Sequence, residues 1–231
     1  MGTSLSVARV PPDQLFLDRM PSAVRRAFLL CIKLPLFSAS RWYLAGGTAL
    51  ALQVGHRKSV DLDFFTPRRI FFEDDVEREL LATGEWATTL RRKGTIYGTL
   101  LKAKMSLIAY PFFIPSKEKN RHGTVQMLLP HDIAAMKIVT VSQRGRKRDF
   151  VDLYWYCLNR EPLGAVIRRA VSQFPGQEDN ITHILKSLTY FADAEADPMP
   201  TIFFRADWRG IKNYFRREAS KIVQNELIKA P

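Results

Sequence analysis

Two aspartates separated by one residue are the strongest candidates for chemistry in this chain of 231 residues. Asp61 and Asp63 alternate with apolar residues in SVDLDFF, and this period of two predicts a strand over residues 59–65. Both carboxylates would then point to one face, roughly 7 Å apart at Cα, where a cation between them relieves their repulsion. Mg²⁺ prefers such oxygen ligands and keeps positions for substrate phosphates. Taken alone, such a pair is usually the solvated face of an amphipathic strand.

A pair of glycines precedes the acidic strand. Gly46 and Gly47 close the apolar run 42–45, which predicts a buried strand, and residues 48–54 favour a helix that Gly55 would end. Glycines at a strand-to-helix turn let backbone N–H groups approach a phosphate, and the helix N-terminus favours its negative charge. A lone Gly-Gly is usually only a turn, but its combination with the acidic strand predicts a phosphate and metal site.

This combination resembles the nucleotidyltransferase superfamily with a polymerase-β-type core. More closely, residues 45–65 are similar to the first two motifs of the AbiEii/AbiGii-type nucleotidyltransferases, the toxin half of many bacterial toxin–antitoxin operons; they read AGGTALALQVGHRKSVDLDFF. Two later segments also resemble that family, DIAAMKIVTVSQRGRKRDFVDLYWY at 132–156 and LTYFADAEADPMP at 188–200. The resemblance runs from about residue 41 to residue 208, most of the chain.

The resemblance implies a role for individual residues. Asp61 and Asp63 would bind the metal, Mg²⁺ or Mn²⁺, and Asp149 would be a further catalytic acid. The residues expected to bind the nucleotide are Gly46, Gly47, Thr48, Arg57, Ser59 and Lys137. Without the resemblance, Lys137 would be interpreted as a surface lysine and Asp149 as an acid near a helix start.

Two of these assignments come from position along the chain. Arg57 and Ser59 lie between the helix and the two aspartates, and Ser59 shares their face of the strand. Arg57 or Lys58 could assist a triphosphate, although a solvated loop is an equal alternative.

One departure from the superfamily pattern concerns a third acid. Many polymerase-β-type transferases carry it on a later central strand, as a metal ligand or general base. The corresponding strand here is expected near residues 104–108, KMSLI, which hold no acid. Either Asp149 supplies this function from the helical part of the chain, or base catalysis is left to solvent and substrate.

The surrounding elements predict an α+β fold, a mixed sheet flanked by helices. Residues 1–129 are expected to form the nucleotidyltransferase core with an N-terminal helix, and residues 130–231 a helical lobe that brings Lys137 and Asp149 to the cleft. Residues 1–12 should be a loose arm, and Pro21 should interrupt a helix over 13–33. The other expected helices are 73–81, 131–143, 148–158, 163–173, 181–191 and 210–228, with a loop at 193–200; the other expected strands are 86–90, 96–101, 106–110 and 125–129.

Charge and cysteine content limit the classes of partner. Lys and Arg total 35 against 23 acids, a net charge of +12, which favours a polyanion although it could serve only solubility. The basic run 144–148 precedes Asp149 and should border the cleft. Cys31 and Cys157 are expected to be free thiols, and no secretory or membrane-spanning pattern is present, so a cytoplasmic protein without a membrane partner is expected.

The expected function is therefore a metal-dependent nucleotidyltransferase, the toxin of a toxin–antitoxin system. It would transfer a nucleotide from an NTP to an acceptor hydroxyl, with RNA and tRNA in particular as the favoured acceptor, and a cognate antitoxin as a possible partner. The alternatives are a catalytically silent NTP- or RNA-binding module and a small-molecule nucleotidyltransferase. A cationic small acceptor would favour an acidic cleft, which the basic charge disfavours.

Overall fold

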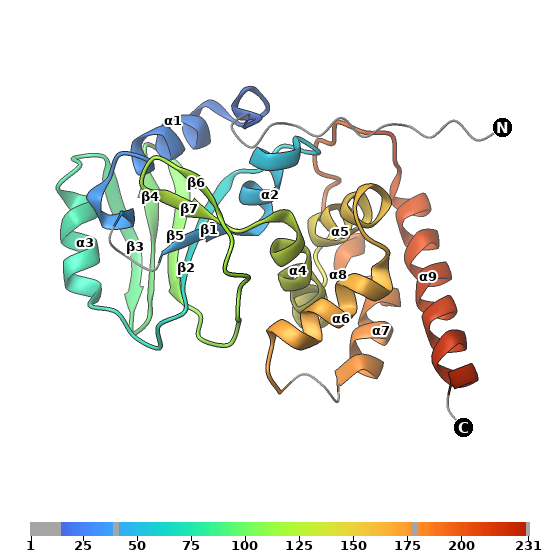
Figure 1. The fold of residues 1–231 in the computed structure, drawn as a ribbon. Coiled ribbons are helices and arrows are strands. Elements are labelled where there is room, and N and C mark those ends of the chain that lie inside the picture. Colours follow the sequence, from blue (N-terminus) through green and yellow to red (C-terminus); the bar gives the residue numbers. More distant parts are fainter. Residues whose placement is uncertain (1–14, 39–41, 177–179, 230–231) are drawn as a thin grey trace.

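The computed structural model describes residues 15–38, 42–176 and 180–229, and within them it contains one mixed sheet of seven strands (Figure 1). The strand order is β3-β4-β5-β2-β1-β7-β6. Neighbouring strands are antiparallel except for the parallel pairs β2–β5 and β1–β7. The expected α+β fold is confirmed. The arm expected at residues 1–12 lies outside the described residues.

All six predicted strands are present, and one further short strand was not predicted. The strands are β1 Tyr43–Ala45, β2 Asp61–Thr66, β3 Trp86–Arg92, β4 Thr95–Leu100, β5 Ala103–Ala109, β6 Asn120–His122 and β7 Val125–Met127. The unpredicted strand, β6, is polar and has only three residues, too few to show an alternating pattern.

The helices also follow the sequence closely. They are α1 Ser22–Cys31, α2 Gly46–Val54, α3 Glu73–Leu81, α4 Pro130–Arg144, α5 Lys147–Asn159, α6 Leu163–Gln173, α7 Ile181–Thr189, α8 Ala192–Glu195 and α9 Trp208–Lys229, with short 3-10 turns at Leu17–Arg19 and Pro35–Phe37. Pro21 separates the first 3-10 turn from α1, as predicted. The helix expected to run to residue 191 ends at Thr189, and α8 forms inside the expected loop. No helix in the described chain is long and apolar enough to span a membrane.

Strand β2 lies at the centre of the sheet, and its two faces differ in polarity. Leu62 and Phe64 are fully buried, and the Phe64 ring stacks on Phe37 with centroids 4.2 Å apart. The intervening residues Asp61 and Asp63 are on the opposite face. The predicted alternation is therefore present, although Val60, expected on the apolar face, precedes the strand and is half exposed.

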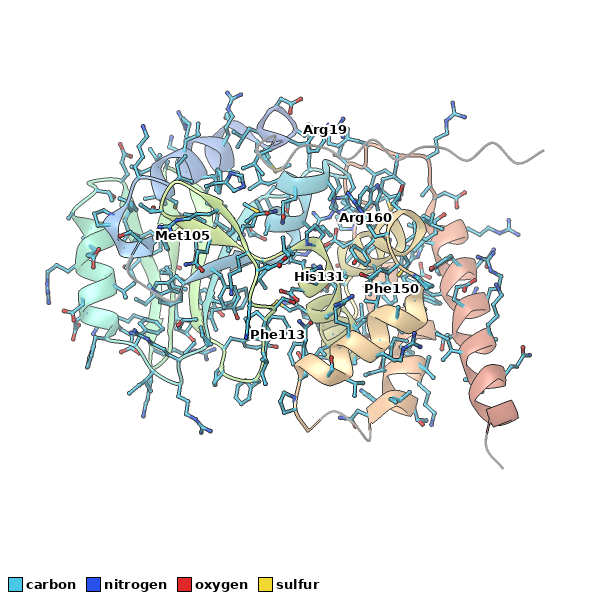
Figure 2. All side chains as sticks on the ribbon, viewed as in Figure 1. Arg19, Met105, Phe113, His131, Phe150 and Arg160 are labelled. Atoms are coloured by element: carbon cyan, nitrogen blue, oxygen red, sulfur yellow. The ribbon has the colours of Figure 1, made fainter. Side chains whose placement is uncertain are left out.

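Two hydrophobic clusters divide the described chain. The first joins the sheet to α1, α2 and α3 and contains Met105; the second joins α4–α9 around Phe150 (Figure 2). Helix α4 contributes to both, with Ile133 and Met136 in the first and Ala134 and Ile138 in the second. In Figure 1 this helix lies between the sheet and helices α5–α9. Helix α4 is therefore a wall shared by the two clusters, and the division into domains near residue 130 stays a prediction.

The buried face of β2 gives a test of the core. We expect Phe64→Ala to lower the free energy of unfolding by about 3–5 kcal/mol, because it removes a ring from a packed interior. Phe72→Ala is the matched control: Phe72 is 78% exposed, so its loss should cost within about 0.5 kcal/mol. Urea denaturation of the two variants measures the difference, and equal costs would contradict the packing described for β2.

Candidate functional site

The acidic face of β2 lines a narrow cavity beside helix α4. Asp61 and Asp63 lie on its sheet side, and Lys137 lies on the helical side. The cavity has a volume of about 90 Å³. Its full lining is Gly46, Gly47, Arg57, Ser59, Asp61, Asp63, Phe65, Ile133, Met136, Lys137, Thr140, Arg144 and Arg148. The structure thus brings together seven of the nine residues predicted from the sequence, all but Thr48 and Asp149.

Strand register explains why the glycines meet the aspartates. Ala45, the last residue of β1, pairs with Asp63, so α2 begins directly beside this carboxylate. The helix starts at Gly46, two residues earlier than predicted, and Gly46 has a φ of +72°. A Cβ on Gly46 would lie 3.0 Å from Asp63 Oδ2, and a Cβ on Gly47 would lie 2.1 Å from a guanidinium nitrogen of Arg57. Gly46 therefore needs glycine for its backbone conformation, and Gly47 needs glycine for its close approach to Arg57.

Thr48 supports the cavity indirectly, through bonds to the start of β2. It is buried, and its hydroxyl lies 2.9 Å from the Ser59 hydroxyl and also bonds the backbone oxygen of Asp61. These contacts fix the start of β2 against α2. Thr48 does not line the cavity, so its direct contact with a nucleotide phosphate stays a prediction.

Asp152, which the sequence analysis did not select, lies at the centre of a buried ionic cluster. Its carboxylate accepts two hydrogen bonds from Arg57, at 2.5 and 2.9 Å, and lies 3.0 Å from Lys137 Nζ. His56 Nε2 lies 2.7 Å from Asp152 Oδ1. Because a carboxylate only accepts, Nε2 carries the proton of the imidazole. Residues from the α2–β2 connection, α4 and α5 thus meet at one side chain.

The charges of this cluster stabilise one another. Burial alone would raise the pKa of Asp152, but Arg57 and Lys137 hold it well below its usual value. Burial would lower the pKa of Lys137, but Asp149 and Asp152 raise it. The shifts therefore favour the charged forms of Arg57, Lys137 and Asp152, which lie side by side. His56 is the exception, because burial lowers its pKa and keeps it neutral.

Asp149 lies behind Lys137 and has no exposed surface. One carboxylate oxygen bonds Lys137 Nζ, and the other has no hydrogen-bond partner within the described chain. Since Asp149 does not line the cavity, its contact supports a positioning role through Lys137. A direct catalytic role for Asp149 stays a prediction.

On β5, where the pattern of many polymerase-β-type transferases predicts a third acid, this chain has the hydroxyl of Ser106. Ser106 on β5 pairs in parallel register with Asp63, and its hydroxyl donates a 2.7 Å hydrogen bond to Asp63 Oδ1. Burial, reinforced by the Asp61 charge, raises the pKa of Asp63 despite this bond. A bound cation would offset both effects.

The donor set fits a divalent ion that shares its ligands with substrate. Two carboxylates face one cavity, and Mg²⁺ commonly takes one or two carboxylates with phosphate and water oxygens. Among the described residues no group of three or more histidine, cysteine or acidic side chains could enclose a metal without such help.

A family model described as nucleotidyl transferase AbiEii toxin, type IV TA system, matches residues 29–101 and 108–226. The chain belongs to this family. The resemblance found in the sequence is therefore confirmed, and the protein is a nucleotidyltransferase of the AbiEii toxin family.

Individual relatives agree with this assignment. An uncharacterized protein of Aquifex aeolicus, aq_aa25, is 31% identical over 186 residues, which cover 80% of this chain and 89% of the relative. The fold is similar to a crystal structure from H. pylori described as a candidate nucleotidyltransferase, with a TM-score of 0.52, 15% identity, and coverage of 90% and 98% of the two chains. It is also similar to MenT4, the nucleotidyltransferase toxin Rv2826c of Mycobacterium tuberculosis H37Rv, with a TM-score of 0.50, 16% identity, and coverage of 87% and 85%.

The spacing of acids in the sequence already indicates a role for Asp152. Asp149 and Asp152 are three residues apart on α5, so both carboxylates fall on one helix face. A helix face that carries two acids and packs inside a lobe needs cations opposite it, and Arg57 and Lys137 were already candidate residues.

The neutral state of His56 in this AbiEii-family protein predicts a pH dependence of stability. In the unfolded chain, His56 becomes protonated below pH about 6.5. In the folded chain its pKa is lower, because burial and the nearby Arg57 and Lys137 outweigh the attraction of Asp152. Unfolding then takes up a proton, so stability rises with pH up to this value, by at most about 1.4 kcal/mol per unit.

The matched pair His56→Gln and His183→Gln tests this, with urea denaturation measured in steps from pH about 5 to 7. His183 is exposed, so its variant should keep the wild-type slope while His56→Gln flattens it. The same slope in all three proteins would contradict a neutral buried His56.

Proposed function

We propose that this nucleotidyltransferase is metal-dependent and transfers a nucleotide from an NTP to a hydroxyl of RNA, with tRNA as the favoured acceptor. The observation that supports this most strongly is one cavity lined by two carboxylates, a helix N-terminus with two glycines, and a lysine. Carboxylates suit a divalent cation, and backbone N–H groups at a helix start suit a phosphate.

The transfer exchanges one phosphorus–oxygen bond for another. The acceptor hydroxyl oxygen bonds to the α-phosphorus, the bond from that phosphorus to the bridging oxygen breaks, and pyrophosphate leaves. The hydroxyl proton passes to solvent or to a carboxylate of the cavity. A divalent ion, when bound, supplies charge neutralisation of the phosphates and activation of the attacking oxygen.

The chain's own residues provide the binding and orientation for this step. Asp61 and Asp63 would hold the metal, and the hydrogen bond from Ser106 fixes one oxygen of Asp63 so that the other faces the cavity beside Gly46. Gly47 and Lys137 receive the nucleotide phosphates. Asp149 and Asp152 act through Lys137 and Arg57, whose side chains they hold in place.

The charge of the chain favours RNA over a small cationic acceptor. The net charge is +12, and two of the exposed cations, Arg144 and Arg148, line the cavity itself. A polyanion gains from these groups, whereas a cation is repelled. The toxin assignment of the family further suggests an antitoxin as partner and action in the cytoplasm, where NTPs and tRNA are present.

The first test is nucleotide transfer by purified protein with Mg²⁺, each α-³²P-labelled NTP in turn, and total bacterial RNA on a denaturing gel. We expect a labelled band of tRNA size with the wild type and a loss of at least about a thousandfold in Asp63→Asn, because a metal ligand is removed. Asp193→Asn, a change of an exposed acid on α8, should retain activity.

Growth inhibition on expression should follow the same order as transfer. No label in any RNA with folded wild-type protein would contradict the RNA acceptor. Full transfer or full toxicity in Asp63→Asn would contradict the catalytic role of the carboxylate pair.

A further inference from the structure

A second cavity adjoins the first and is much larger. It has a volume of about 490 Å³ and shares Arg57, Ser59 and Arg148 with the first cavity, so the two lie side by side. The first cavity has a volume of about 90 Å³, well below the roughly 300 Å³ at which pockets for small-molecule ligands begin. It can hold a metal and phosphate groups but no complete nucleotide. The rest of any nucleotide substrate must extend into neighbouring space.

The second cavity is lined by exposed cations on one side. Lys58 and Arg146 are exposed, and the Lys58 side chain has no acidic partner within the described chain. Arg146 and Arg148 each lie 3.4 Å from a carboxylate, Asp197 and Asp61 respectively, with side chains 54% and 45% exposed. Asp197 is the single acid in the described lining. A surplus of solvent-accessible cations remains, which suits phosphodiester groups.

The rest of the lining is largely apolar. Val60, Pro198, Met199 and Pro200 belong to it, and Val60 and Met199 are 51% and 38% exposed. Such a wall suits the face of a nucleobase, which is apolar over most of its area. Cations and an apolar wall together match the two parts of one nucleotide.

The cavity is built by contacts that fix its walls. Backbone hydrogen bonds join Lys58 N to Thr201 O at 2.9 Å and Phe203 N to His56 O at 2.8 Å. Asp197 accepts a 3.0 Å bond from the backbone N–H of Lys147, and the buried Lys147 ammonium bonds the backbone oxygens of Glu195 and Asp197. The segment 197–201 is therefore tied both to the approach to β2 and to the start of α5.

The two cavities beside β2 differ in the chemistry of their linings. Phe65 lines the first cavity beyond Asp63, and its ring packs against Tyr110 with centroids 5.5 Å apart. The second cavity lies before Asp61, at residues 57–60. The base of an incoming NTP is uncharged and suits the aromatic end of the first cavity, whereas a polynucleotide carries further phosphates and suits the cationic second cavity.

We propose that the second cavity binds the terminal nucleotide of the RNA acceptor, with Lys58 and Arg146 on its phosphates and Met199 against its base. This places the acceptor hydroxyl next to the catalytic carboxylates. The inference rests on the proposed transfer to RNA, and it adds a site for the acceptor that is separate from the NTP phosphates.

The first test compares Lys58→Ala/Arg146→Ala with the matched control Lys93→Ala/Arg168→Ala, which removes one exposed lysine and one exposed arginine elsewhere. We expect the first variant to raise KM for RNA at least tenfold, with kcat and KM for NTP within twofold of wild type. The slope of log affinity for RNA against log salt should decrease in magnitude by about 1.4, for two lost phosphate contacts. An unchanged KM for RNA, the same rise in the control, or a rise in KM for NTP instead would overturn the proposal.

The second test measures binding without transfer, by fluorescence anisotropy. A labelled single-stranded RNA that ends in a 3′-deoxynucleotide is displaced by unlabelled linear RNA or by a circle of the same sequence. We expect the linear RNA to bind at least fivefold tighter than the circle in the wild type and the control, and no such preference in Lys58→Ala/Arg146→Ala. Equal displacement by both forms in the wild type would overturn terminal-nucleotide binding.

The two tests separate this site from the proposed reaction. If end-dependent binding requires Lys58 and Arg146 while the wild type labels no RNA, transfer to RNA fails and the binding site stands. If the wild type labels RNA and the variant does so with unchanged KM, the reaction stands and the proposed site fails.

Discussion

The rest of the site depends on the hydrogen bonds and ion pairs of the Asp152 carboxylate. It is fully buried on α5, yet it bonds His56 and Arg57 from the α2–β2 connection and Lys137 from α4. An unpaired charge at such depth would cost several kcal/mol, so the carboxylate is tolerated only while all these partners converge on it. Since the partners come from the sheet half and the helical half, their convergence fixes the two halves relative to each other. The width of the cleft follows from this arrangement.

The balance of charge in this cluster limits what attracts a nucleotide. Arg57 and Lys137 are each paired with a buried carboxylate, so much of their positive charge is balanced within the cluster. On the proposed function, the glycine N–H groups of α2 and a cation between Asp61 and Asp63 would add to the attraction that Lys137 offers a phosphate. Nucleotide binding would then be coupled to metal binding by electrostatics.

The sequence predicted the local parts of the site and not its long-range pairing. The alternation around Asp61 and Asp63 and the Gly46–Gly47 turn are local, since each depends on neighbours within a few residues. The bonds of Asp152 to Arg57 join residues 95 positions apart, and no spacing along the chain reveals them. The substitution of Ser106 for a third acid was visible as a missing carboxylate, but the hydrogen bond that replaces it depends on the parallel register of β2 and β5. Strand β6 and helix α8 have three and four residues, too few for their periodicity to be recognised.

The basic run 144–148 shows how a charge pattern acquires meaning only in three dimensions. In the sequence it is one block expected to border the cleft. In the structure its members separate: Arg144 and Arg148 line the first cavity, Arg146 and Arg148 the second, and Lys147 is buried. The glycine between Arg144 and Arg146 adopts a φ of +42° and ends α4, so the chain turns and α5 restarts beside the cleft. Lys147, directed inward, anchors the segment near Asp197 that walls the second cavity. This segment of five residues therefore both anchors the wall of the second cavity and places positive charge in the two cavities. A basic surface kept only for solubility would not require this arrangement.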